Sequence, residues 1–281
     1  MSHSIAWGNQ LSQRLNCRVS NFGVKGYGTD QAYLRFRHNT SDDSQVVILG
    51  YFSDNIVRNV TRNFSFLYPS KNLGLKPRFI LDDDQSLKLL RIPRFPIDEL
   101  KRVADSRHVL ANDYLAPGGP AGNFVVRFPY TVGVLRAFGQ FRVKANRARL
   151  PFWAEFYEWY HPSRALQITT QIIRAFVEDA TESGRDPIVV FFPSSLDFEA
   201  YRKNKRWIYE PLIDRLRKHD VQVLNIGSAL MPFIRSRDPC SLYTKCPVGH
   251  FNRPGSELIA RIVADQLVRL NLRRSRPAGD E

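Results

Sequence analysis

The stretch from Val19 to Leu34, VSNFGVKGYGTDQAYL, combines the signals of a strand, a tight turn and a helix. Its first residues, Val19–Phe22, predict the end of a short buried strand. Three glycines then indicate a tight turn: Gly23, Gly26 and Gly28. We expect Thr29 or Asp30 to cap the helix that follows. Glycines at such a junction let backbone N–H groups approach a bound group closely, beside the positive end of the helix dipole. Standing alone, a pattern of this kind favours a plain strand-to-helix turn.

Strand and helix patterns alternate along the rest of the chain. Further strands are predicted at three apolar runs: Gln45–Gly50 (QVVILG), Pro187–Pro193 (PIVVFFP) and Val221–Gly227 (VQVLNIG). Helices are predicted over Trp7–Leu15, Asp30–His38, a segment that begins near Ser163, Ile208–His219, and a segment that begins near Asn252. This βα rhythm predicts a single α/β domain over residues 1–281, built on a doubly wound parallel sheet.

Residues 65–150 interrupt the βα rhythm and are predicted to form an insertion. KPRFILDD and SLKLLRIP, separated by an acidic turn at Asp82–Gln85, predict a β-hairpin. Helices are predicted over Ile97–Leu110 and Tyr130–Ala145. Aromatic residues are frequent from here on, and core packing explains them better than a substrate cleft. They are Phe138, Phe141, Phe152, Trp153, Phe156 and Trp159.

Three segments, in this order, resemble sequence blocks of the SGNH (GDSL-type) hydrolases. Those enzymes carry a Gly-Asp-Ser nucleophile turn, a glycine turn, an Asn turn and a late His. Here NFGVKGYGT (residues 21–29) resembles the second block, Gly50–Asn59 (GYFSDNIVRN) the third, and Gly249–Ala260 (GHFNRPGSELIA) the fourth. The resemblance implies a three-layer sandwich with a mainly parallel, flavodoxin-like sheet. It also implies a serine esterase or acylhydrolase that acts on an ester, such as an acylated carbohydrate, and it implies no metal or organic cofactor.

The resemblance assigns roles to three residues. His250 would be the catalytic base and then the acid. The backbone N–H of Gly26 and the side-chain amide of Asn55 would form the oxyanion hole. The family block usually reads Gly-x-Asn-Asp, whereas Asp54 precedes Asn55 here, so this assignment involves a shift of one residue. Taken by itself, Asn55 slightly favours a helix cap, a role that Asp54 would also suit.

Two departures from the family pattern bear on activity. No Gly-Asp-Ser occurs in the chain, so the nucleophile is absent. Family members usually place an Asp two or three residues before the His, and those positions are Val248 and Pro247 here. We therefore expect a truncated, inactive hydrolase that lacks the first, central strand. The alternatives are a carbohydrate O-acetyltransferase-like protein and a non-catalytic binding descendant of the fold.

The net charge and its distribution indicate which partners to expect. A formal charge of +14 would suit a nucleic-acid binder, but the basic residues are scattered and the denser groups fit solvated helix faces, so nucleic acid is not an expected partner. The substrate expected is a small-molecule or carbohydrate ester.

The three cysteines, Cys17, Cys240 and Cys246, have no metal-ligand spacing and are expected to be free thiols. No membrane segment or signal peptide is recognised, which favours the cytoplasm for the chain as written.

Overall fold

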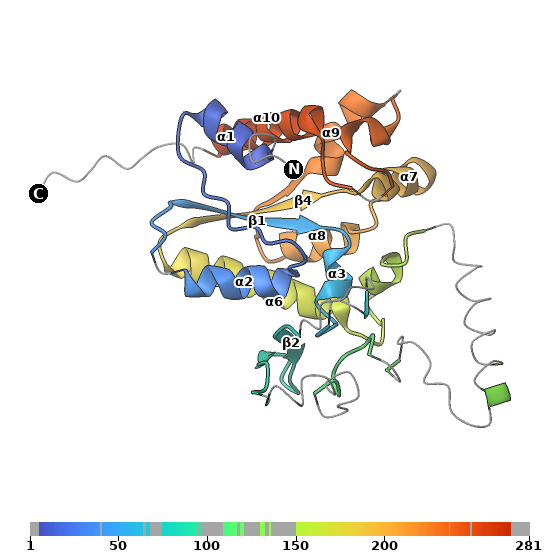
Figure 1. Ribbon diagram of the computed structural model, residues 1–281. Coiled ribbons are helices and arrows are strands. Elements are labelled where there is room, and N and C mark those ends of the chain that lie inside the picture. Colours follow the sequence, from blue (N-terminus) through green and yellow to red (C-terminus); the bar gives the residue numbers. More distant parts are fainter. Residues whose placement is uncertain are drawn as a thin grey trace, which may run out of the picture.

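The computed structural model places a three-stranded parallel sheet between two layers of helices (Figure 1). It describes residues 6–39, 41–63, 66–67, 75–94, 96, 109–116, 119–120, 130–132, 135, 150–235, 237–247 and 249–270. The fold is thus mixed α/β, as the sequence predicts. Among the described residues, no helix is both long enough and apolar enough to span a membrane.

The sheet has the order β1–β4–β5, with β1 at Val46–Phe52, β4 at Asp186–Phe192 and β5 at Val223–Asn225. Strands β1 and β4 pair in parallel over their full length, from Val46 opposite Asp186 to Phe52 opposite Phe192. The central strand β4 is buried from Ile188 onward because helices cover both faces of the sheet. A strand with no solvent-facing side is apolar throughout, which explains the run IVVFF.

One helical layer contains α1 (Trp7–Leu15), α9 (Ile226–Ile234) and α10 (Arg253–Arg269), and the other contains α2 (Thr29–His38), α6 (Ala165–Glu182) and α8 (Glu210–Arg217). Four further elements lie near the carboxyl ends of the strands: α3 (Asn55–Arg58), η4 (Ala154–Tyr157), α7 (Ser195–Asn204) and η5 (Pro239–Leu242). The five predicted helices are all present. Their boundaries agree to within two residues, and the first agrees at both ends.

The predicted strand at Val19–Phe22 is wrong. These residues belong to no strand and pair with no strand among the described residues; Val19 packs against the core, but Phe22 is 41% exposed. The cap of α2 also differs from the prediction, because Gly28 occupies the N-cap position. A Cβ at Gly28 would lie 3.1 Å from the Cβ of Arg58, so close packing against α3 favours glycine here.

Strand β1 therefore forms an edge of the sheet. The carbonyl of Gln45 accepts a hydrogen bond from the N–H of Asp186 at 2.7 Å, so the backbone groups of Gln45 face β4. In a parallel ladder, successive residues direct their backbone groups alternately toward the partner strand and away from it. The residues that point away from β4 are Val46, Ile48, Gly50 and Phe52. In the part of the chain that the structure describes, their outward groups have no hydrogen-bond partner.

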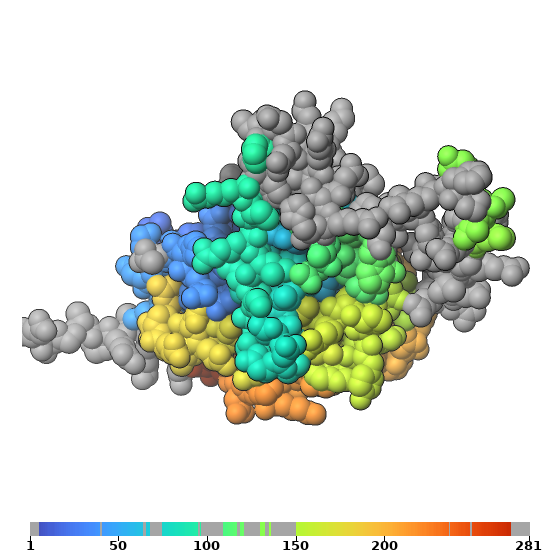
Figure 2. All heavy atoms as spheres, turned by 90° about the horizontal axis from the view of Figure 1, so that it is seen from below, coloured from blue at the N-terminus to red at the C-terminus, as the bar shows by residue number. Residues whose placement is uncertain are grey.

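The predicted hairpin is confirmed, with β2 at Arg78–Leu81 antiparallel to β3 at Leu87–Leu90. Seen from below, the segment of residues 75–94 (teal) lies against the helical layer that contains α2 and α6 (Figure 2). A buried ion pair between Lys76 and Asp30 of α2 joins the two parts. Burial lowers the pKa of Lys76, and Asp30 opposes that shift.

Much of the rest of the predicted insertion lies outside the described residues, including nearly all of the predicted helices Ile97–Leu110 and Tyr130–Ala145 and the aromatic residues Phe138 and Phe141. The other four aromatic residues divide into two pairs. Trp153 and Phe156 belong to the core, as expected. Phe152 and Trp159 are exposed instead.

Candidate functional site

The corner between β1 and α3 holds the side chain of Asn55 in a buried position. Asn55 is the first residue of α3 and is 7% exposed, while Asp54 occupies the N-cap position. The Asn55 amide makes no hydrogen bond within the described part of the chain, so it does not serve as the helix cap considered above. A buried amide without a partner retains its N–H groups for a ligand.

The glycine turn packs against this corner. Gly26 is half-buried with φ of +85°, a left-handed conformation that glycine adopts without steric cost. Its neighbour Tyr27 accepts a hydrogen bond at its carbonyl from Arg58 Nη1, at 3.1 Å. Arg58 also pairs with Asp54 at 2.7 Å. The structure thus brings the Gly26 turn and the Asn55 helix into contact through Arg58.

His250 lies in the loop between η5 and α10. A bridge between Tyr243 and Phe251 closes this loop, and the Phe251 ring lies 6.4 Å from that of Phe52 and 6.3 Å from that of Phe192. Since Phe52 and Phe192 end β1 and β4, the loop sits at the carboxyl edge of the sheet.

The imidazole of His250 is exposed. Its ring nitrogens make no hydrogen bond to any of the described residues. Its backbone carbonyl accepts from the N–H of Thr244 at 2.8 Å and from the Thr244 hydroxyl at 3.1 Å. No hydrogen bond in the described part of the chain joins His250 to Asn55 or to Gly26. The three residues therefore lie on separate elements at one end of the sheet.

A disulfide closes the loop before His250, which corrects the expectation of free thiols. Cys240 and Cys246 are bonded, with their Cα atoms 5.6 Å apart, and Cys17 is free. The η5 turn and the Tyr243–Phe251 bridge fold the chain back on itself, which brings the two cysteines to a separation that a disulfide can span. Beyond the loop, Asn252 caps α10 by accepting from the N–H of Gly255 at 3.0 Å.

A buried polar cluster adjoins the Asn55 corner, and the sequence reasoning did not identify it. Asp197 of α7 is fully buried, and its Oδ2 accepts from Ser53 Oγ at 2.5 Å, Ser194 Oγ at 2.8 Å and Ser194 N–H at 2.7 Å. Its Oδ1 is buried with no hydrogen-bond partner. Burial raises the pKa of Asp197 to about 6, against the hydrogen bonds from the two serines. The spacing of Ser194 and Asp197 is that of a capping box, the one available sequence signal.

Two buried tyrosines complete the cluster. Tyr157 donates to the carbonyl of Ser53 at 2.7 Å, and its hydroxyl lies 2.8 Å from that of Tyr51. Burial raises the pKa of both phenols well above the usual range, so both remain neutral. Ser53, two residues before Asn55, is therefore fixed through both its side chain and its backbone. Being 1% exposed and bonded to Asp197, it is not accessible as a nucleophile.

Comparison with family models, with curated proteins and with solved structures finds no match to this chain. The geometry of the site therefore carries the functional argument. Among the described residues, no group of three or more His, Cys, Asp or Glu side chains could hold a metal ion.

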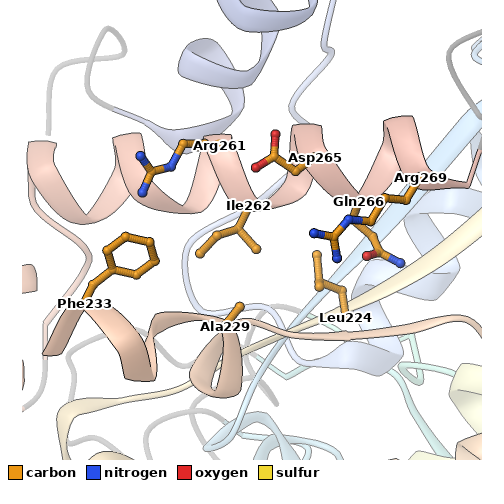
Figure 3. A pocket seen from close by; sticks show the side chains of 8 residues that line it. All are labelled: Leu224, Ala229, Phe233, Arg261, Ile262, Asp265, Gln266 and Arg269. Carbon is orange, nitrogen blue, oxygen red and sulfur yellow. The ribbon is translucent and has the colours of Figure 1, made fainter. Parts of the chain in front are cut away.

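A groove of about 520 Å³ lies elsewhere in the molecule, between α9 and α10 (Figure 3). Phe233 and Ile262 contribute apolar surface, and the guanidinium of Arg261 lies over the Phe233 ring at 4.9 Å. Neither Gly26, Asn55 nor His250 lines this groove. It is therefore separate from the candidate site at the carboxyl edge of the sheet.

Proposed function

We propose that this chain is an SGNH-type serine esterase or acylhydrolase, with a flavodoxin-like sheet, that acts on small-molecule or carbohydrate esters. In the complete reaction, a serine Oγ bonds to the ester carbonyl while His250 takes the serine proton. The Gly26 N–H and the Asn55 amide hold the oxyanion. The C–O bond to the alcohol then breaks, and His250 returns the proton to that alcohol. Water releases the acyl group in the second half of the reaction.

The observation that carries the proposal is the buried, uncommitted amide of Asn55 beside the Gly26 turn. A donor held in a fixed position needs little reorganisation when negative charge develops, and one such donor contributes about 3 kcal/mol to transition-state stabilisation. An ordinary structural Asn at 7% exposure would direct its amide to a protein partner. The position of the Phe251 anchor at the ends of β1 and β4 supports His250 as the base from the same edge.

Among the described residues, the serines beside the site are already hydrogen-bonded: Ser53 and Ser195 are buried, and the Oγ of the half-buried Ser194 donates to Asp197. The open edge of β1 is where an additional strand would pair, beside the Asn55 corner. We propose that such a strand, ending in the nucleophilic serine, completes the site. It would also satisfy the outward backbone groups of β1.

Hydrolysis of p-nitrophenyl acetate tests this proposal. The 281-residue chain should be inactive, and the chain extended by the in-frame codons upstream of Met1 should hydrolyse the ester. In that active form, His250→Ala and Asn55→Ala should each abolish or strongly reduce turnover, whereas His219→Ala and Asn204→Ala, changes at exposed sites, should not. Unchanged hydrolysis in His250→Ala would contradict the assigned base. Absence of activity from the extended chain would contradict the proposal as a whole.

A non-catalytic binding protein of the same fold is the second candidate, and the setting of His250 favours it. No carboxylate orients the exposed imidazole in the described part of the chain. A binding protein would retain affinity for an acylated sugar in both His250→Ala and the parent chain, without turnover in any form. An O-acetyltransferase would instead transfer the acetyl group to an added carbohydrate acceptor, which the same assay detects as faster p-nitrophenol release.

A further inference from the structure

The segment from Pro193 to Asp197 contacts the Asn55 side of the candidate site through one side chain. Asp197 accepts from Ser53 Oγ at 2.5 Å, and Ser53 directly precedes the Asp54–Asn55 pair at the end of β1. Three donors converge on the single atom Oδ2. The corner is therefore tied to the first turn of α7 by a charge-assisted bond inside the protein.

The same segment contacts the His250 loop through two other residues. Ser195 Oγ donates to the carbonyl of Pro247 at 2.8 Å, three residues before His250. The carbonyl of Pro193 accepts from the hydroxyl of Tyr243 at 2.8 Å, and Tyr243 stacks on Phe251 with ring centroids 4.7 Å apart. Pro247, Tyr243 and Phe251 all belong to the loop that carries His250.

We propose that Pro193–Asp197 is the positioning segment of the candidate site, with Asp197 holding the Asn55 corner and Ser195 holding the His250 loop. Asn55 and His250 have no hydrogen bond to each other within the described residues, and this shared segment connects their two sides by hydrogen bonds, in addition to the packing of Phe251 against Phe52. This inference rests on the proposed function, because a positioning role matters only if Asn55 and His250 act together. Its experimental test does not depend on activity. Asp197 and Ser195 are positioning residues, since they act through Ser53 and Pro247.

A change in the protonation state of Asp197 should then change the environment of the Asn55 amide. When Asp197 is ionised, Oδ2 holds both serine hydroxyls as donors, and protonation weakens that acceptor. The titratable groups that face Asp197 are Asp54, Tyr51, Tyr157, Tyr209 and Tyr243. Burial keeps the tyrosines neutral, and Asp54 is paired with Arg58. A titration transmitted to Asn55 near pH 6 would therefore report on Asp197.

The experiment follows the backbone amide of Ser53 and the side-chain amide of Asn55 by ¹H–¹⁵N NMR of the 281-residue chain from pH 4.5 to 7.5. Both signals should move with a common midpoint near 6. In Asp197→Asn, which keeps an acceptor oxygen but cannot ionise, this titration should disappear. It should persist in Asp186→Asn, a change at an exposed carboxylate in the same strand–helix unit. A midpoint retained in Asp197→Asn would overturn the inference.

Two further variants test the roles of Asp197 and Ser195 separately. They also keep the inference testable if Asp197→Asn does not fold. Ser53→Ala should leave the titration visible at the Ser194 amide and remove it from Asn55. Ser195→Ala should shift the signals of His250 and Phe251 and leave those of Asn55 unchanged. Equal shifts at both sides in either variant would contradict the division of roles. None of these measurements requires turnover, so a failure of esterase activity counts against the proposed function alone.

Discussion

The two sides of the candidate site are held in different ways. The Asn55 corner is fixed by a buried network of hydroxyls and one carboxylate, and Asn55 is itself a buried residue. The His250 loop is fixed by a backbone bridge, by ring packing and by a disulfide, and its imidazole is exposed. An amide that stabilises charge benefits from a rigid, dry position, whereas a group that exchanges protons needs access to solvent or substrate. The contrast matches the two chemical roles proposed.

The largest expected effect comes from removing the ring that anchors the His250 loop. Phe251 is 5% exposed and packs against Tyr243, Phe52 and Phe192, so Phe251→Ala should lower the free energy of unfolding by about 3–5 kcal/mol. Urea denaturation measures this loss. The same substitution at Phe233, which is 41% exposed, is the control and should cost far less. Equal losses would show that the loop does not depend on its anchor.

The Asn55 side should respond to pH instead. The pKa of Asp197 is raised from 3.8 to about 6, so the folded state binds this proton more tightly than the unfolded chain. Its contribution to stability is therefore complete below pH 4 and is lost as the pH rises through 6, a decrease of roughly 3 kcal/mol. Asp197→Asn should remove this decrease, as measured by denaturation at pH 4.5 and 7.5. A slope that is the same in both proteins would assign it to other groups.

The disulfide contributes only to the His250 side. Cys240 and Cys246 enclose a short loop, so its reduction should lower the free energy of unfolding by about 2 kcal/mol. Thiol titration of the denatured, unreduced chain should find Cys17 alone, and reduction should expose all three thiols. Three thiols before reduction would contradict the bond. Because disulfides persist in oxidising compartments, the same count made on protein from its native host also tests the cytoplasmic prediction.

The smallest effect on stability is expected at His250 itself. An exposed imidazole without a hydrogen bond supports little packing, so His250→Ala should change the free energy of unfolding by no more than about 0.5 kcal/mol. If the chain has esterase activity, the same variant should lose it. A large loss of stability in this variant would make His250 a structural residue.

Local patterns in the sequence predicted most of the secondary structure. The helix Trp7–Leu15 was predicted at both ends, because Trp7, Leu11 and Leu15 recur at helical spacing. The hairpin followed from two β-rich runs around an acidic turn. The parallel strands followed from apolar runs, since a strand covered on both faces needs apolar side chains everywhere. The three candidate residues came from motif resemblance, and the assignment of their roles is still a prediction.

Only the tertiary structure decided which of these elements pair and which polar groups meet. Val19–Phe22 has the composition of a strand but remains unpaired, because strand formation depends on a neighbour that no local pattern specifies. The disulfide depends on the bend between Cys240 and Cys246. Asp197 lies 144 positions from Ser53 in the sequence, and only the side-by-side packing of β1 and β4 brings them within 2.5 Å. Local residue patterns determine helices and strands because their causes are local, whereas burial, pairing and pKa shifts arise from contacts between distant segments.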